Sequence, residues 1–194
     1  MPIDKFTTLE STYVPLPVEN VDTDQIIPAR FLKATSRDGF GENLFRDWRY
    51  TPDGKENPDF VLNQSEYSGE ILVGGKNFGS GSSREHAAWA IHDYGFKVVV
   101  SSFFADIFQN NALNNGVLPV TVSAKFLSQI FDALEKNKNQ KLVVDLETQR
   151  VGLNGASETF VINPYKKNCL LKGFDDIDFL LDRKNKIEAF EANK

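Results

Sequence analysis

The pattern of apolar and polar positions after residue 69 predicts short strands that alternate with helices. Apolar runs at residues 70–73 and 96–101 are typical of buried strands, and residues 84–94 between them have the periodicity of an amphipathic helix. The apolar residues that recur on one face of that helix are Ala87, Ala90, Ile91 and Tyr94. This order predicts two parallel strands joined by a helix.

The same alternation continues toward the C-terminus. A helix is expected over residues 103–111 and a strand over 117–122, which completes a β-α-β-α-β unit. Further strands are expected at residues 141–146 and 159–162, and Asn154-Gly155 predicts a tight turn before the second of them. We therefore predict an α/β fold with a mostly parallel sheet core and flanking helices.

The first third of the chain is less regular. Residues 12–18 are extended in character, but Pro15 and Pro17 restrict them to an edge strand or an irregular crossing. Residues 33–68 alternate glycines and prolines with aromatic side chains, and a loop of this length is usually functional or disordered. Because disordered segments are normally poor in aromatic residues, we expect a lid or docking surface, or else a satellite cluster packed on the main core.

Length and composition limit the class of protein. The chain has 194 residues, of which 41% are hydrophobic, and this suits one domain over residues 1–194 with the excursion at about 33–68. Its 22 basic and 27 acidic residues give a net charge of −5, which argues against nucleic acid as a partner. No apolar run approaches the roughly 20 residues that cross a membrane, and the N-terminus lacks a signal-peptide core. A cytoplasmic protein is expected.

The residues that usually bind metals are scarce. Cys169 is the only cysteine, which excludes an internal disulfide and any Cys-ligated zinc or iron–sulfur centre built from this chain alone. The only histidines, His86 and His92, are six residues apart and lie on different sides of the predicted helix, so they are not a metal pair. Any cluster must come from another chain.

The densest chemical feature is residues 74–86, between a predicted strand and a predicted helix. Four glycines in this segment let the backbone turn sharply and approach a ligand, and the helix N-terminus directs unpaired N–H groups to the same point. Arg84, in the first helical turn, adds a guanidinium that can hold a carboxylate or phosphate through two hydrogen bonds. The segment therefore predicts an anion-binding site.

Familiar nucleotide and hydrolase motifs do not fit this segment. A P-loop requires lysine where Ser80 stands, and a Rossmann loop requires its third glycine where Arg84 stands. A Gly-x-Ser-x-Gly elbow is also absent from the sequence. The segment therefore contains neither of these nucleotide-binding motifs, which were the best evidence for nucleotide binding.

Ser82 permits two interpretations. Ser82 and Glu85 have the spacing of a capping box, and the residues alone favour this structural role. The alternative is a base, because a helix N-terminus and Arg84 both stabilise a Ser82 alkoxide that could remove a proton from an acidic C–H. Asp22 and Asp24 are typical turn residues, and their functional alternative is that one of them orients an arginine at the site.

Four segments of the chain resemble, in this order, the small subunits of 3-isopropylmalate dehydratase, which belong to the aconitase superfamily. They are VDTDQIIPARFL at residues 21–32, NFGSGSSREHA at 77–87, FADIFQNN at 104–111 and CLLKGFDDI at 169–177. The resemblance implies the swivelling β/β/α domain found as the aconitase C-terminal domain. It also implies a [4Fe-4S] cluster held by a separate large subunit, with which the chain forms a heterodimer or larger complex.

The resemblance also implies a reaction and residue roles. A hydro-lyase of this family dehydrates 2-isopropylmalate to isopropylmaleate and rehydrates it to 3-isopropylmalate, in leucine biosynthesis. Ser82 corresponds to the base, Arg84 to the group that grips a carboxylate of the dicarboxylate substrate, and Ser83 lies beside them. Asp24 belongs to the active-site shell. Arg30 and Arg37 both lie where a further carboxylate contact could arise, and Arg37 is included among the substrate-binding candidates.

Two other functions remain open at this point. The same apparatus could belong to the small subunit of homoaconitase or of a citramalate isomerase. A function of a different class is a non-catalytic regulatory module that binds a phosphorylated or carboxylated metabolite through the glycine-rich segment.

Overall fold

A computed structural model describes residues 4–82 and 84–192 of the chain. The described residues form a seven-stranded sheet in the order β4-β3-β2-β1-β5-β6-β7. The strands are β1 (Thr8–Leu16), β2 (Ile71–Gly74), β3 (Val98–Ser101), β4 (Leu118–Thr121), β5 (Lys141–Asp145), β6 (Arg150–Leu153) and β7 (Ala156–Thr159). Strands β1 to β4 are parallel, and β5, β6 and β7 continue the sheet with antiparallel pairing. The predicted α/β fold with a parallel core is confirmed.

Strand β1 joins the two halves of the sheet. Its residues 8–12 pair with β5, and its residues 13–16 pair with β2. The prediction of an edge strand was therefore wrong, because β1 is the central strand of the sheet order. Pro15 is tolerated there since β1 leaves β5 after Thr12, so that Pro15 has a strand partner on one side only, opposite Val73.

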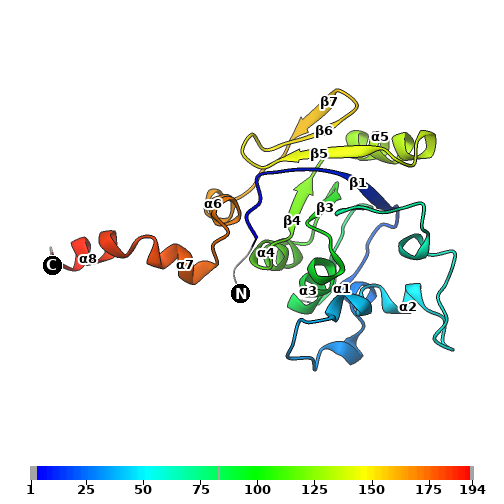
Figure 1. The fold of residues 1–194 in the computed structure, drawn as a ribbon, viewed down its shortest axis with the longest axis horizontal. Coiled ribbons are helices and arrows are strands. Elements are labelled where there is room, and N and C mark those ends of the chain that lie inside the picture. Colours follow the sequence, from blue (N-terminus) through cyan, green and yellow to red (C-terminus); the bar gives the residue numbers. More distant parts are fainter. Residues whose placement is uncertain (1–3, 83, 193–194) are drawn as a thin grey trace.

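Helices cover both faces of the sheet (Figure 1). Helices α3 (Glu85–Tyr94) and α4 (Asp106–Asn114) pack on one face, and α5 (Ala124–Lys136) packs on the other. Because strand side chains alternate between faces, Val98 and Val100 enter the core beneath α5, whereas Val99 enters the core beneath α3 and α4. These two layers fix the carboxyl ends of the parallel strands.

Two predicted elements begin at different residues in the structure. The helix expected over 103–111 is α4 and begins at Asp106, because Phe103 and Ala105 exchange backbone hydrogen bonds with Phe78. The strand expected over 159–162 is β7, which ends at Thr159. Asn154 and Gly155 have φ of 50° and 82°, so they turn the chain directly from β6 into β7, and the strand begins right after the turn.

Residues 17–70 connect β1 to β2 through short helical segments. These are α1 (Thr23–Ile26), η1 (Ala29–Phe31), η2 (Phe40–Asn43), α2 (Arg46–Arg49) and η3 (Val61–Asn63). The aromatic part of this connection packs on α3: Phe40 and Phe45 are buried, and the Gly41 N–H donates to Asp93 at 2.7 Å. Phe45 and Trp48 stack with ring centroids 5.5 Å apart.

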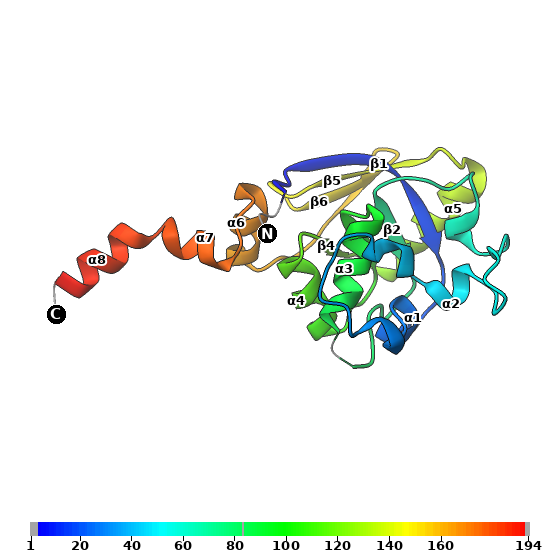
Figure 2. The same ribbon diagram turned by 60° about the horizontal axis from the view of Figure 1, so that its bottom comes forward.

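The C-terminal helices extend the molecule to one side. Helix α6 (Pro164–Lys172) packs on the sheet domain through Leu170, and α7 (Asp176–Leu181) and α8 (Lys184–Ala192) project from it as an arm (Figures 1 and 2). Among the residues that the structure describes, no helix is both long and apolar enough to cross a membrane.

Candidate active site

The glycine-rich loop, residues 75–84, runs from the carboxyl end of β2 to the first turn of α3. The N–H groups of Gly79 and Ser80 donate to the Val21 carbonyl at 2.8 and 3.1 Å, and the Thr23 N–H donates to the Ser80 carbonyl at 2.9 Å. These bonds join the loop to the segment that begins α1. Two motifs that are 56 residues apart at their first residues, Val21 and Asn77, therefore form one site.

Gly79 has to be a glycine at the centre of this loop. Its φ is +76°, and an added Cβ would lie 2.2 Å from the ring of Phe108 in α4. Gly75 also allows a close approach, since a Cβ there would lie 2.4 Å from the Val18 carbonyl oxygen. The loop is consequently clamped between the segment after β1 and the start of α4.

Ser82 is exposed at the outer end of the loop. The buried Thr23 hydroxyl donates to the Ser82 carbonyl at 2.7 Å and so fixes the backbone of that residue. Within residues 4–82 and 84–192, no hydrogen bond engages the Ser82 hydroxyl itself. The Ser82 backbone is therefore held in position by Thr23, and the residue is exposed to solvent.

The interpretation of Ser82 as a helix cap was wrong. Helix α3 begins at Glu85, its N-cap is Arg84 in an extended conformation, and among the described residues no side-chain hydrogen bond caps the helix there. The loop thus places Ser82 outside the cap position, and Glu85 makes other contacts. Its carboxylate accepts hydrogen bonds from Trp89 Nε1 at 3.1 Å and Asn115 Nδ2 at 3.3 Å.

Arg84 and Asp24 form a two-bonded ion pair across the site. Arg84 Nη2 donates to Asp24 Oδ2 at 2.7 Å, Nη1 donates to Oδ1, and Nη1 also contacts the Ile27 carbonyl at 3.4 Å. The Arg84 side chain is 13% exposed and the Asp24 side chain is 55% exposed. A guanidinium has five N–H donors, so this arrangement leaves two for a ligand.

Asp22 has a different position from Asp24. Its carboxylate accepts from the Gln25 N–H at 2.8 Å, and the Gln25 side chain accepts from the Asp22 N–H at 2.9 Å, which completes a capping box on α1. Asp22 therefore starts the helix that carries Asp24. Of the two aspartates, Asp24 is the one that contacts an arginine of the loop.

The two arginines of the 30–37 segment diverge. Arg30 pairs with Asp47, with Nη1 to Oδ2 at 3.0 Å, and this pair raises the pKa of Arg30 and lowers the pKa of Asp47. Arg37 instead lies over the Trp89 ring at 4.5 Å and contacts Glu85 at 3.4 Å. Arg37 is thus attached to the first turn of α3, directly after Arg84.

The histidines do not meet in the structure. His86 Nε2 lies 3.2 Å from the Ala34 carbonyl oxygen, and its ring packs 4.4 Å from the Trp89 ring. His92 lies in the last turn of α3. In the part of the chain that the structure describes, no three His, Cys, Asp or Glu side chains are grouped so that they could hold a metal ion.

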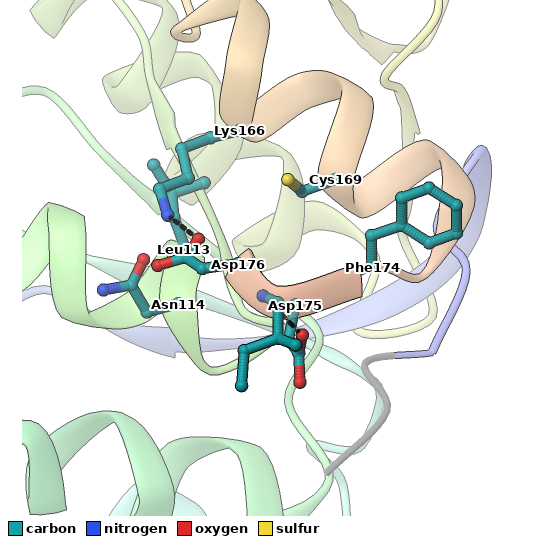
Figure 3. A pocket seen from close by; sticks show the side chains of 8 residues that line it. Leu113, Asn114, Lys166, Cys169, Phe174, Asp175 and Asp176 are labelled. Carbon is teal, nitrogen blue, oxygen red and sulfur yellow. Dashed lines mark hydrogen bonds and ion pairs between the residues drawn. The ribbon is translucent and has the colours of Figure 1, made fainter. Parts of the chain in front are cut away.

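Cys169 is buried in α6, beside a cavity of about 230 Å³ (Figure 3). The figure shows Lys166 directed at Asp176 across this cavity, and Lys166 Nζ donates to Asp176 Oδ1 at 2.9 Å. Burial raises the pKa of the Cys169 thiol. The thiol is therefore a protonated, packed side chain and not an exposed metal ligand.

Sequence reasoning missed two supporting contacts of the site. Thr23 reads as an ordinary helix residue, and no local pattern indicates that its hydroxyl reaches Ser82, 59 residues away. The platform that Glu85 and Trp89 make for Arg37 has a local signal, because these two residues are four apart and share a helix face. Ser83, predicted to lie beside Ser82 and Arg84, is outside the described residues.

Comparisons with known proteins identify relatives of the whole chain. The family model "Aconitase C-terminal domain" matches residues 3–125. A 3-isopropylmalate dehydratase small subunit from Cytophaga hutchinsonii is 65% identical over 97% of this chain and 95% of its own length. Another from Azobacteroides pseudotrichonymphae is 64% identical and covers 98% of each chain. A crystal structure of 3-isopropylmalate dehydratase from Methanocaldococcus jannaschii has a TM-score of 0.68 at 24% identity, covering 95% of this chain and 99% of that chain, and therefore supports the fold.

Proposed function

The chain belongs to the family of 3-isopropylmalate dehydratase small subunits, and from this premise we propose that it is the smaller part of a two-subunit hydro-lyase. The complex would convert 2-isopropylmalate to 3-isopropylmalate through isopropylmaleate, within leucine biosynthesis in the cytoplasm. Dehydration removes a C–H proton and a hydroxyl from neighbouring carbons, and rehydration adds them back with their positions exchanged.

Ser82 is the proton acceptor in this proposal. Its oxygen takes the proton from the substrate carbon during dehydration and returns a proton during rehydration. The accessible hydroxyl and the Thr23 contact that fixes the Ser82 backbone support this role, since a base has to be both open to substrate and held in place. The neighbouring Arg84 guanidinium favours the alkoxide form electrostatically.

Arg84 binds a carboxylate of the substrate. Its fork is oriented by Asp24, and the donors that Asp24 and Ile27 leave free can engage a second carboxylate. Because the Arg84 side chain is largely enclosed, its charge is less screened than that of a surface arginine. Ser83 and Arg37 complete the proposed substrate-binding set, and the attachment of Arg37 to Glu85 and Trp89 keeps it beside the loop.

The iron–sulfur cluster that the family implies does not fit the residues of this chain. The described residues contain no suitable group of ligands, and the only cysteine is buried with a raised thiol pKa. We therefore assign the [4Fe-4S] cluster to the large subunit. There it would supply a Lewis acid for the substrate hydroxyl, and this chain would supply the base and the carboxylate grip.

The observation that carries the proposal is the accessible Ser82 hydroxyl on a clamped loop that also positions Arg84. The test is to reconstitute the chain with a 3-isopropylmalate dehydratase large subunit and to assay 2-isopropylmalate, citramalate and homocitrate in parallel. We expect turnover of 2-isopropylmalate to exceed that of the other two substrates. Preferential turnover of homocitrate or citramalate would reassign the substrate, and no turnover of any of the three would contradict the proposal.

A further inference from the structure

Three large apolar side chains beside the glycine-rich loop are left exposed. The exposed fractions of Val18, Phe103 and Ile107 are 41%, 51% and 52%. Val18 follows β1, Phe103 follows β3, and Ile107 lies in the first turn of α4. All three therefore lie where the carboxyl ends of the parallel strands meet.

Backbone contacts place these residues on both sides of the loop. The Val18 carbonyl packs on Gly75, and the Phe103 carbonyl accepts the Phe78 N–H at 3.0 Å. The Ser101 hydroxyl bridges the two sides, with the Gly75 carbonyl at 2.7 Å and the Phe103 carbonyl at 2.9 Å. Ile107 is adjacent to Phe108, whose ring supports Gly79. The apolar residues thus flank the same loop that carries Ser82.

We propose that Val18, Phe103 and Ile107 form a docking surface for the large subunit. The inference rests on the proposed function, which requires the partner to bring its cluster to Ser82 and hence to reach this end of the sheet. Side chains that border the loop are then covered in the complex, and covering them removes apolar area from water. Apolar side chains flanked by polar ones are typical of such interfaces.

A second copy of this chain is a poorer occupant of the same surface. A copy seated on Val18 and Phe103 would stand over the glycine-rich loop and compete with the large subunit for access to Ser82. The other group of exposed apolar side chains, which includes Ile177, Leu180 and Leu181, lies on the projecting arm, far from the loop (Figure 2). Only for the surface beside the loop does the proposed reaction identify the partner, because the large subunit has to reach Ser82 there.

The experiment titrates the small subunit into a limiting amount of cluster-loaded large subunit and measures the concentration that gives half-maximal isomerase activity. The test variant is Phe103→Ser with Ile107→Ser, and Val18→Ser is measured separately. We expect the double variant to raise the half-saturating concentration about tenfold or more, which corresponds to about 1.4 kcal/mol of binding. The rate at saturation should stay within about twofold of wild type, because neither residue is part of the chemistry.

The matched control is Val161→Ser, which removes an 86% exposed apolar side chain beyond β7, at the opposite edge of the sheet. Circular dichroism and thermal unfolding of each free variant exclude a folding defect. If the double variant and the Val161→Ser control have the same half-saturating concentration, the proposal of a docking surface is wrong. If the free wild-type chain forms a dimer and the double variant stays monomeric, the surface binds a second copy of this chain instead. If wild type itself neither binds nor activates the large subunit, the proposed function fails instead.

Discussion

Asp24 and Arg84 are paired side chain to side chain across 60 residues of sequence, and this pair connects α1 to the loop that carries Ser82. The pair has a specific geometry, with both carboxylate oxygens facing one guanidinium. It gives Arg84 a fixed direction while leaving part of its hydrogen-bonding capacity free. The account of the site depends on this orientation.

Replacing Asp24 by asparagine should weaken substrate binding more than folding. Asparagine keeps the size of the side chain and one of its two oxygens, so most contacts of this half-exposed residue remain, but Arg84 loses the charged partner that directs its fork. We expect KM of the reconstituted enzyme to rise about tenfold, a loss of about 1.4 kcal/mol, with a smaller change in kcat. Steady-state kinetics checks this, with Asp59→Asn, an exposed aspartate outside the site, as control. Equal KM values for both variants would contradict the orienting role.

Replacing Asp22 by alanine should weaken folding more than substrate binding. Asp22 caps α1 through the Gln25 N–H and makes no contact with Arg84 among the described residues. Loss of an N-cap costs about 0.5–2 kcal/mol, and in a chain of this size each kcal/mol lowers Tm by roughly 2–4 °C. Calorimetry of the free chain measures the shift. An unchanged Tm would show that the cap is unimportant for the stability of the fold.

Gly79 should not tolerate a side chain. Gly79→Ala places a methyl group against the Phe108 ring at a φ of +76°, so both strain and overlap oppose it. We expect a loss of about 2 kcal/mol or more in the free energy of unfolding, measured by denaturant titration. Gly155→Ala is the matched control, because Gly155 has a φ of +82° and nothing within 4 Å, so it should lose only about 1 kcal/mol. Equal losses in the two variants would mean that the Phe108 contact has no effect.

Cys169 should react slowly with thiol reagents in the folded chain. Its pKa is raised by burial, so at neutral pH the folded chain contains less thiolate than the unfolded chain does. The rate of labelling should increase as pH rises toward the folded pKa, and it should increase strongly in denaturant. Labelling kinetics with a chromogenic disulfide measures both effects. Rapid labelling of the folded chain at pH 7 would contradict the buried position.

The sequence predicted the parallel core because its signals are local. The strand at 96–101 and the helix at 84–94 are each defined by their own periodicity, and both appear within a few residues of their expected bounds. The same local reasoning failed for β1, since Pro15 looks unfavourable until the change of partner strand after Thr12 is known. The strand expected at residues 159–162 is β7, at Ala156–Thr159. It begins earlier because the chain turns at Asn154 and Gly155 and pairs with β6 directly after that turn.

In the site, too, the sequence reveals local patterns but not the contacts between distant segments. The glycines and Arg84 of the loop are recognisable from their spacing, but the contact between Thr23 and Ser82 depends on how α1 packs beside the loop. The capping box failed for a related reason. Ser82 and Glu85 have the right spacing, yet the extended backbone of Arg84 starts the helix too late for Ser82 to cap it.

The central claim is that the Ser82 oxygen, in its alkoxide form, accepts the substrate proton and becomes a hydroxyl, and Ser82→Ala in the reconstituted complex tests it most directly. Removing a general base costs about 10²–10⁴ in rate, so we expect kcat for 2-isopropylmalate to fall by about a thousandfold. KM and the affinity for the large subunit should change by less than severalfold, because Arg84 and the docking surface are intact. A variant whose kcat stays within about twofold of wild type would contradict the account.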